Sequence, residues 1–126
     1  MRVVPSSSLR RAVVAATVVV AALAGPPGCS STPLGTGPVA DAAYAEAKPV
    51  IAALESFKAA KGHYPAKLVE LVPAYVPRVP PESGPGTIFN FVPKGSSYQL
   101  SFSYEGPGMN NCAYEPGRTW SCRGHY

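Results

Sequence analysis

The chain has 126 residues and a formal net charge of +4, and 14% of its residues are charged. Three of its eleven basic residues lie near the N-terminus, at Arg2, Arg10 and Arg11, so the rest of the chain carries eight basic and seven acidic residues. A nearly neutral chain without a Lys/Arg cluster excludes the nucleic-acid-binding proteins that depend on a basic surface. Its length allows one small domain.

The N-terminal stretch predicts an export signal. Three arginines precede the segment 12–24, which is apolar apart from Thr17. This segment is too short to span a bilayer as a helix, which needs about 20 residues, but it suits the apolar core of a signal peptide. We therefore expect residues 1–28 to be a signal peptide.

The residues that follow resemble the lipobox of bacterial lipoproteins. Gly28 precedes Cys29 and small polar residues follow it, although Pro26 stands where a lipobox normally has Leu. The resemblance implies cleavage before Cys29, attachment of a fatty acid such as palmitate to that residue, and anchoring in the inner or outer membrane of the bacterial cell envelope. Cleavage after Ala24 is the alternative, and it would release a soluble protein with a free Cys29 thiol.

The segment after this cysteine predicts a linker. From Ser30 to Val39 most residues are Ser, Thr, Pro and Gly. Such a segment is typical of a flexible tether, and about ten extended residues reach roughly 30 Å. We expect residues 29–39 to be the lipidated cysteine and a tether, which holds a globular domain, residues 40–126, clear of the membrane surface.

A long amphipathic helix is predicted from Ala40 to Gly62. Asp41 fits the N-cap position, and Gly62 can adopt the left-handed conformation that ends a helix. Pro49 either kinks this helix or begins it anew, and the sequence leaves both possibilities open. Apolar residues recur at steps of three and four, and they define the expected buried stripe: Tyr44, Ala47, Ile51, Leu54 and Phe57.

A second, shorter helix is expected after Gly62. Pro65 suits the first position of a helix and Pro73 cannot continue one, so the helix should lie between them. Its expected buried residues are Leu68, Leu71 and Val72. The Pro-rich segment 75–86 that follows is incompatible with a helix or an interior strand.

The hydrophobic period then changes from 3.6 to 2, which indicates antiparallel strands. Phe89 and Phe91 alternate with Asn90, and residues 93–96 supply turn chemistry. The next strand should bury Tyr98, Leu100, Phe102 and Tyr104, and residues 105–111 read as a loop. We therefore expect an α+β fold, in which one long N-terminal helix packs on a small antiparallel sheet. The predicted helix–sheet contact places Ile51, Leu54 and Phe57 against Phe89, Leu100 and Phe102.

The cysteines predict a disulfide. If Cys29 carries lipid, Cys112 and Cys122 remain as a pair in an exported, oxidising environment. A metal site is disfavoured, because His63 and His125 lie at unrelated positions and no Cys-x-x-Cys occurs. We expect neither a metal nor a cofactor.

The same segment predicts a C-terminal hairpin. Directly opposed residues of an antiparallel pair have a constant index sum, so a register that joins the two cysteines also pairs Tyr114 with Trp120. A Pro-Gly pair between them suits the turn. The residues expected to form an interaction surface on this hairpin are Tyr114, Arg118, Trp120 and Arg123.

The order of these elements resembles the soluble domain of type IV pilin-like proteins, particularly type II secretion pseudopilins. The resemblance covers roughly residues 40–104, and it rests on a helix that runs into Gly62-His63-Tyr64-Pro65, a Leu-rich turn, and Pro-spaced chain before aromatic strands. It implies the fold of a pilin-like globular head. The apolar N-terminal helix through which such proteins assemble has no counterpart in the sequence, and no Asp lies beyond Asp41 to form a pseudopilin calcium loop.

No catalytic arrangement stands out. Glu105 and Glu115 lack apolar neighbours that would raise their pKa, and neither a Gly-x-Ser-x-Gly elbow nor a Gly-rich phosphate loop occurs. We expect a non-enzymatic, membrane-anchored envelope lipoprotein that contacts other proteins, with those of secretion or pilus-type machinery as candidates. The alternative is a surface module that binds glycan or peptide through exposed aromatic residues: Tyr98, Tyr104, Tyr114 and Trp120.

Overall fold

The computed structural model describes residue 25, residues 32–106 and residues 108–125. The predicted lipid-attachment residue, Cys29, and the predicted signal peptide, apart from Gly25, lie outside the described residues and remain predictions. The chain divides into two units, Met1–Ser30 and Ser31–Tyr126, and the fold is that of the second. Within the described part of the chain, no helix is long and apolar enough to cross a membrane.

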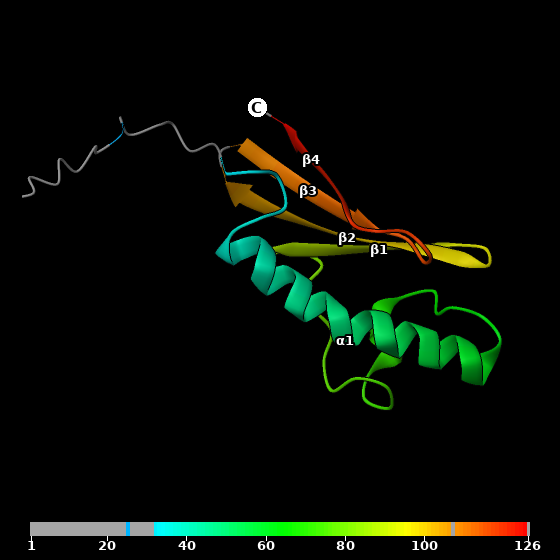
Figure 1. Ribbon diagram of the computed structural model, residues 1–126. Helices are drawn as coiled ribbons and strands as arrows, with labels where there is room; N and C mark the ends of the chain where they lie inside the picture. Colours follow the sequence, from blue (N-terminus) through cyan, green and yellow to red (C-terminus); the bar gives the residue numbers. More distant parts are fainter. Residues whose placement is uncertain (1–24, 26–31, 107, 126) are drawn as a thin grey trace, which may run out of the picture. The chain divides into compact units, whose positions relative to one another are not determined.

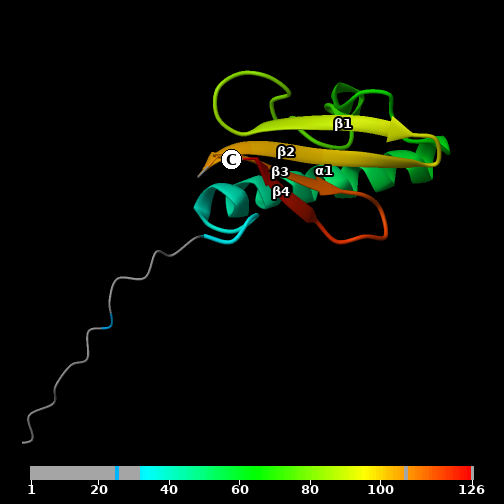
Figure 2. The same cartoon turned by 90° about the horizontal axis from the view of Figure 1, so that it is seen from above.

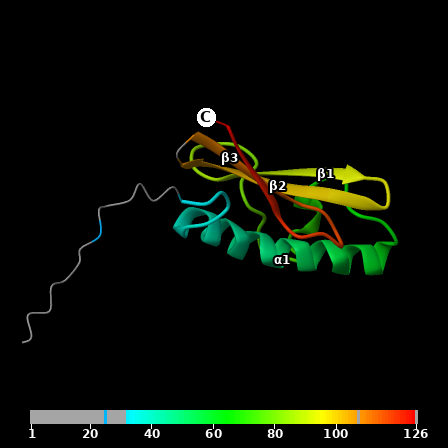
Figure 3. The ribbon, with the colours of Figure 1, turned by 45° about the horizontal axis from the view of Figure 1, so that its top comes forward.

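One helix and a four-stranded antiparallel sheet form two layers (Figure 1). Neighbouring strands follow one another in the chain, in the order β1-β2-β3-β4, and every pair is antiparallel. The helix crosses one face of the sheet and leaves the other face uncovered (Figure 3). The predicted α+β fold of a helix on an antiparallel sheet is confirmed. The elements are α1 (Pro38–Lys61), η1 (Leu68–Leu71), β1 (Ile88–Lys94), β2 (Ser97–Gly106), β3 (Gly108–Tyr114) and β4 (Ser121–His125).

Helix α1 begins two residues earlier than predicted and runs without a break through Pro49. Its N-cap is Gly37 and Pro38 occupies the first turn, so the expected N-cap, Asp41, lies inside the helix. Of the two possibilities for Pro49, a new helix start is therefore wrong. The predicted stop is confirmed: Gly62 has a φ of 81°, and its N–H donates to the carbonyl oxygen of Lys58 at 2.7 Å.

The buried face of α1 differs in part from the predicted stripe. Tyr44 and Ile51 are only half-buried and pack at the edge of the core. The physical reason is the bulk of the opposing sheet, whose aromatic side chains pack best against small residues. The residues of α1 that are buried are Ala40, Ala43, Ala47, Val50, Ala53, Leu54 and Phe57.

The centre of the core agrees with the sequence prediction. Leu54 and Phe57 belong to the same buried cluster as Phe89, Leu100 and Phe102. Strand β2 alternates as expected, because its four predicted core residues are at most 7% exposed. Ile51 is the one residue of the predicted contact that lies at the margin.

The predicted second helix is only a four-residue 3₁₀ turn, η1. Pro65 is buried ahead of this turn and does not begin it. The turn begins after Lys67, whose N–H donates to the Glu70 carboxylate at 2.8 Å. Leu68 and Leu71 are fully buried as expected, whereas Val72 is half-buried.

The prediction of a loop at residues 105–111 is wrong. Strand β2 continues to Gly106 and β3 begins at Gly108, and these two glycines are paired. Gly108 has a φ of 82°, which permits a reversal of the chain that other residues disfavour. Polar residues occupy this part of β3, so no apolar alternation marks it as a strand. Asn111 belongs there because its side-chain amide donates to the Ser103 hydroxyl of β2 at 2.9 Å.

The predicted tether is also corrected, because residues 32–37 pack on the domain. The Gly35 N–H donates to the Tyr104 hydroxyl at 3.0 Å, and the Tyr44 hydroxyl donates to the Gly35 carbonyl oxygen at 3.0 Å. Gly35 has a φ of 72°, and a Cβ at this position would overlap Cys122 Sγ. The domain therefore begins near Thr32 and not at residue 40.

Candidate interaction surface

The C-terminal hairpin has the predicted disulfide and register. Cys112 and Cys122 are bonded and directly opposed in β3 and β4. The Tyr114 and Trp120 rings are in contact, with centroids 5.5 Å apart, so the predicted pair lies on one face. Trp120 lies one residue before β4 begins. The turn contains the expected Pro-Gly pair, and Gly117 has a φ of 77°.

The two aromatic residues of the hairpin face α1. The Trp120 ring packs against the rings of Tyr44 and Phe102, with centroids 5.1 and 5.2 Å away. Both Tyr114 and Trp120 are half-buried as a result. A hollow of about 330 Å³ lies beside this cluster, lined by Tyr44, Lys48, Ile51 and Trp120.

The two arginines of the hairpin lie on the opposite, outer face of the sheet. Arg118 and Arg123 line a polar hollow of about 290 Å³. The four residues expected to form one interaction surface are therefore divided between two faces, which corrects the prediction. The same hollow is lined by Gln99, Asn111, Ala113, Glu115, Thr119 and Ser121.

The outer face of the sheet is polar across all four strands, because its residues alternate with those of the core. Among the described residues, its large exposed hydrophobic side chains are Val92, 38% exposed, and Met109, 50% exposed. An uncovered polar sheet face is the kind of surface that suits a reversible protein contact. The polar residues along it are Asn90, Gln99, Ser101, Ser103, Asn111, Ser121 and Arg123.

The carboxylates considered for catalysis are separated. Glu105 lies opposite Met109 at one end of the β2–β3 ladder, whereas Glu115 follows the other end. Lys94 donates to Glu115 at 2.8 Å, and this hydrogen bond together with the lysine charge lowers the pKa of that carboxyl. Glu115 therefore ties the hairpin to the end of β1, and the two carboxylates form no acid/base pair.

The two edges of the sheet differ. At β1, the Phe89 N–H donates to the Pro81 carbonyl oxygen at 2.8 Å, and Pro93 has no N–H. The Pro-rich chain before β1 runs along this edge (Figure 2, green). Both features block the addition of another strand.

Strand β4 presents the open edge. The Cα atoms of Cys112 and Cys122 are 4.0 Å apart, which is the short spacing of a pair that exchanges no backbone hydrogen bonds. The N–H and C=O groups of Cys122 and, two residues on, Gly124 therefore point away from β3. Within the described residues, no backbone hydrogen bond from a turn or loop reaches them.

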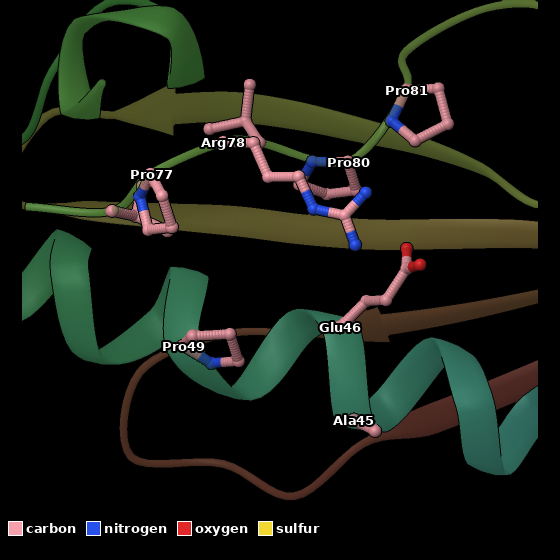
Figure 4. Close-up of a pocket in the computed structure, with 9 residues that line it drawn as sticks. Ala45, Glu46, Pro49, Pro77, Arg78, Pro80 and Pro81 are labelled. Atoms are coloured by element: carbon pink, nitrogen blue, oxygen red, sulfur yellow. The ribbon is translucent and has the colours of Figure 1, made fainter. Parts of the chain in front are cut away.

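Sequence reasoning missed a cavity of about 350 Å³ between α1 and the Pro-rich segment. Figure 4 shows the Arg78 guanidinium group and the Glu46 carboxylate pointing toward one another across it. Pro49 also lines this cavity, so this proline of α1 lies on the side of the helix that faces the Pro-rich segment. The sequence held one signal for this cavity: a proline inside the predicted helix, Pro49, together with the prolines of segment 75–86. The remaining lining residues are Ala45, Val76, Pro77, Val79, Pro80 and Pro81.

The buried tyrosines are structural. Burial and a hydrogen bond to Glu55, 2.9 Å long, raise the pKa of Tyr64 to about 12. Tyr98 is fully buried and its hydroxyl has no hydrogen-bond partner within the described residues. Tyr104 is 7% exposed. Tyr98 and Tyr104 are therefore unavailable for the aromatic platform that the sequence suggested.

No arrangement of three His, Cys, Asp or Glu side chains suitable for a metal ion occurs among the residues that the structure describes. Comparison with protein-family models, with curated proteins and with solved structures finds no match. The role of the two faces is therefore inferred from their own geometry.

Proposed function

We propose that this protein is a non-enzymatic lipoprotein of the bacterial cell envelope, anchored through a lipid on Cys29, whose pilin-like domain contacts other proteins. Components of secretion or pilus-type machinery are the proposed partners. The observation that carries the proposal is the uncovered polar face of the sheet, with the open β4 edge beside Arg118 and Arg123.

The geometry of β4 supports a defined mode of contact. An extended segment of a partner can pair with an open sheet edge, so that main-chain hydrogen bonds supply affinity and side chains supply specificity. Arg123 lies between Cys122 and Gly124, whose backbone groups point away from β3 and have no turn or loop partner among the described residues. Its side chain lines the outer hollow. A partner with acidic groups would meet both arginines there.

The anchor is tested by metabolic labelling with a fatty acid. The wild-type protein should incorporate the label, and Cys29→Ser should not. A lipoprotein cysteine with several acyl chains holds a protein on the membrane far more firmly than one chain does, so a salt wash should not release it. A mature protein that begins at Gly25 with an unmodified thiol would contradict the anchor.

The protein contact is tested by crosslinking in the solubilised envelope, followed by capture through a C-terminal tag. The double variant Arg118→Glu, Arg123→Glu should lose the partner bands seen with wild type. The control, Lys61→Glu with Lys67→Glu, makes the same charge change on exposed residues away from the sheet face. Equal loss in both variants would show that overall charge, and not this face, governs the contact.

The second candidate function is the binding of a glycan or peptide in the hollow beside Trp120. It is favoured by the two aromatic rings, Tyr44 and Trp120, that line this hollow together with Lys48. Because Trp120 is the one tryptophan of the chain, a ligand placed there should change the fluorescence of the whole protein. An unchanged spectrum across a panel of envelope glycans and peptides would reject this function.

A further inference from the structure

We propose that the end of the domain at which residues 32–39 enter rests on the lipid surface itself, through Leu34, Val39 and Met109. This inference deepens the proposed function and rests on its lipid anchor at Cys29. The tether predicted from the sequence would hold the domain clear of the membrane. In this proposal the end of the domain that carries residues 32–39 touches the membrane.

Exposed hydrophobic residues gather at this end. Among the described residues, the large hydrophobic side chains that are exposed number five, and their exposed fractions are 40% for Leu34, 48% for Val39, 50% for Met109, 62% for Val69 and 38% for Val92. Leu34 and Val39 line one hollow of about 160 Å³ together with Gly106. Met109 lies at the same end but on the outer face of the sheet, opposite Glu105 and next to the paired glycines. Figure 1 shows the start of α1 and the β2–β3 turn at the same end of the domain.

The packed position of Gly35 sets how far this end can lie from the membrane. The backbone N–H and C=O groups of Gly35 form hydrogen bonds with the hydroxyl groups of Tyr104 and Tyr44, and these bonds fix the chain on the domain. Cys29 and Pro33 are four residue steps apart, and a fully extended chain spans at most about 14 Å over that interval. A tether of ten free residues would allow roughly 30 Å. The shorter reach keeps Leu34 near the headgroup region in which the lipidated cysteine would lie.

The chemistry of this end favours lipid contact through apolar side chains. Apolar residues on a peripheral protein enter about 5–10 Å into the boundary between headgroups and acyl chains. Two acidic residues lie at this end, Asp41 in the first turn of α1 and Glu105 opposite Met109, and one basic residue, Arg123, lies opposite Asn111. The contact should therefore not require anionic lipid, and it is expected in zwitterionic vesicles.

The test uses the full-length lipoprotein, purified after export and reconstituted in phosphatidylcholine vesicles. An environment-sensitive dye is attached to a cysteine introduced by Met109→Cys. A matched protein carries it through Val92→Cys, near the β1–β2 turn and therefore at the other end of the sheet from the β2–β3 turn. Because the native thiols are occupied by lipid and by the disulfide, the dye marks one position. Lipids with a nitroxide on the headgroup should quench the dye at position 109 and shift its emission to shorter wavelength, and should do neither at position 92.

A second variant shows that the apolar residues make the contact. Adding Leu34→Glu and Val39→Glu to the Met109→Cys protein should abolish the quenching, whereas adding Val69→Glu should leave it unchanged. Circular dichroism verifies that each protein is folded. A dye at position 109 that remains in a water-like environment, or equal quenching at positions 109 and 92, would overturn the inference.

Mass spectrometry of the purified protein separates this inference from the proposed function. If Cys29 carries no acyl group, the anchor fails and the inference fails with it. If Cys29 is acylated and the dye at Met109→Cys is not quenched, the anchor stands and only the membrane contact is wrong.

Discussion

The face that α1 turns toward the sheet can be tested at Leu54. This side chain is 0% exposed and belongs to the central cluster. Leu54→Ala should lower the free energy of unfolding by about 2–5 kcal/mol, because the lost contacts leave a cavity. A domain of this size has a stability on the order of 5–14 kcal/mol. A loss of about 3 kcal/mol should lower the melting temperature by roughly 12–24 °C.

Two neighbouring residues make this test sharper, because the sequence pattern and the structure rank them in opposite order. The pattern placed Ile51 in the stripe and omitted Val50, whereas the structure buries Val50 to 1% exposure and leaves Ile51 half-buried. Val50→Ala removes two buried carbons, at about 0.8 kcal/mol each plus a cavity term, and should cost about 2 kcal/mol. Ile51→Ala removes three carbons beside an open hollow and should cost about 1 kcal/mol or less.

The assay is urea unfolding followed by circular dichroism. The slope of the unfolding free energy against urea concentration should stay constant across the variants. Shifts of the urea midpoint then report changes in stability. If Ile51→Ala costs more than Val50→Ala, α1 is rotated relative to the structure. A loss below about 0.5 kcal/mol for Leu54→Ala would mean that this residue faces solvent.

Four further measurements test the remaining contacts. Reduction of the disulfide, which closes a loop of sequence separation 10, should cost about 2.7 kcal/mol in the chain-entropy model, and an unchanged melting temperature would contradict its structural role. Tyr98→Phe should be neutral or stabilising because its hydroxyl has no hydrogen-bond partner among the described residues, whereas Tyr64→Phe should cost about 1.5–3 kcal/mol by removing a hydrogen bond to a carboxylate. Gly35→Ala should destabilise more than Gly117→Ala, since both have positive φ but only Gly35 is crowded. The raised pKa of Tyr64, about 12, stabilises the fold below pH ~10, and this contribution should be lost as the pH rises toward 12, as measured by alkaline unfolding.

Strong local signals were sufficient for much of the fold. The alternation from Tyr98 to Tyr104 marks a half-buried strand without reference to any other element. The glycine at position 62 ends α1 because few other residue types adopt its backbone conformation. The hairpin register follows from the spacing of the cysteines and aromatics, since opposed residues share one index sum. In each case the deciding interaction lies within a few residues or one ladder.

The errors arose where the deciding interaction was tertiary. Gly35 belongs to a segment with the composition of a linker, and only the hydroxyl groups of Tyr44 and Tyr104 hold it on the domain. The first half of β3 buries the polar Asn110 and exposes the apolar Met109, so the period-2 pattern of a half-buried strand is absent there. The side of α1 that faces the sheet depends on how closely alanines such as Ala47 approach the aromatic residues of the sheet. Local pattern carries no information about these contacts.

The disulfide lies where the two proposed surfaces meet: the edge of β4, and the end of the domain at which residues 32–39 enter. The Tyr44 hydroxyl lies 3.2 Å from Cys122 Sγ and also holds the Gly35 carbonyl group, so the entry segment and β4 are fixed to the same point. Leu34 lies over Gly124, where a Cβ would come within 2.8 Å of it. The open edge of β4 therefore ends at the same place at which the chain enters the domain. If the chain is anchored at Cys29, a partner that pairs with β4 must approach close to the lipid surface, which favours a partner that is itself held in the membrane.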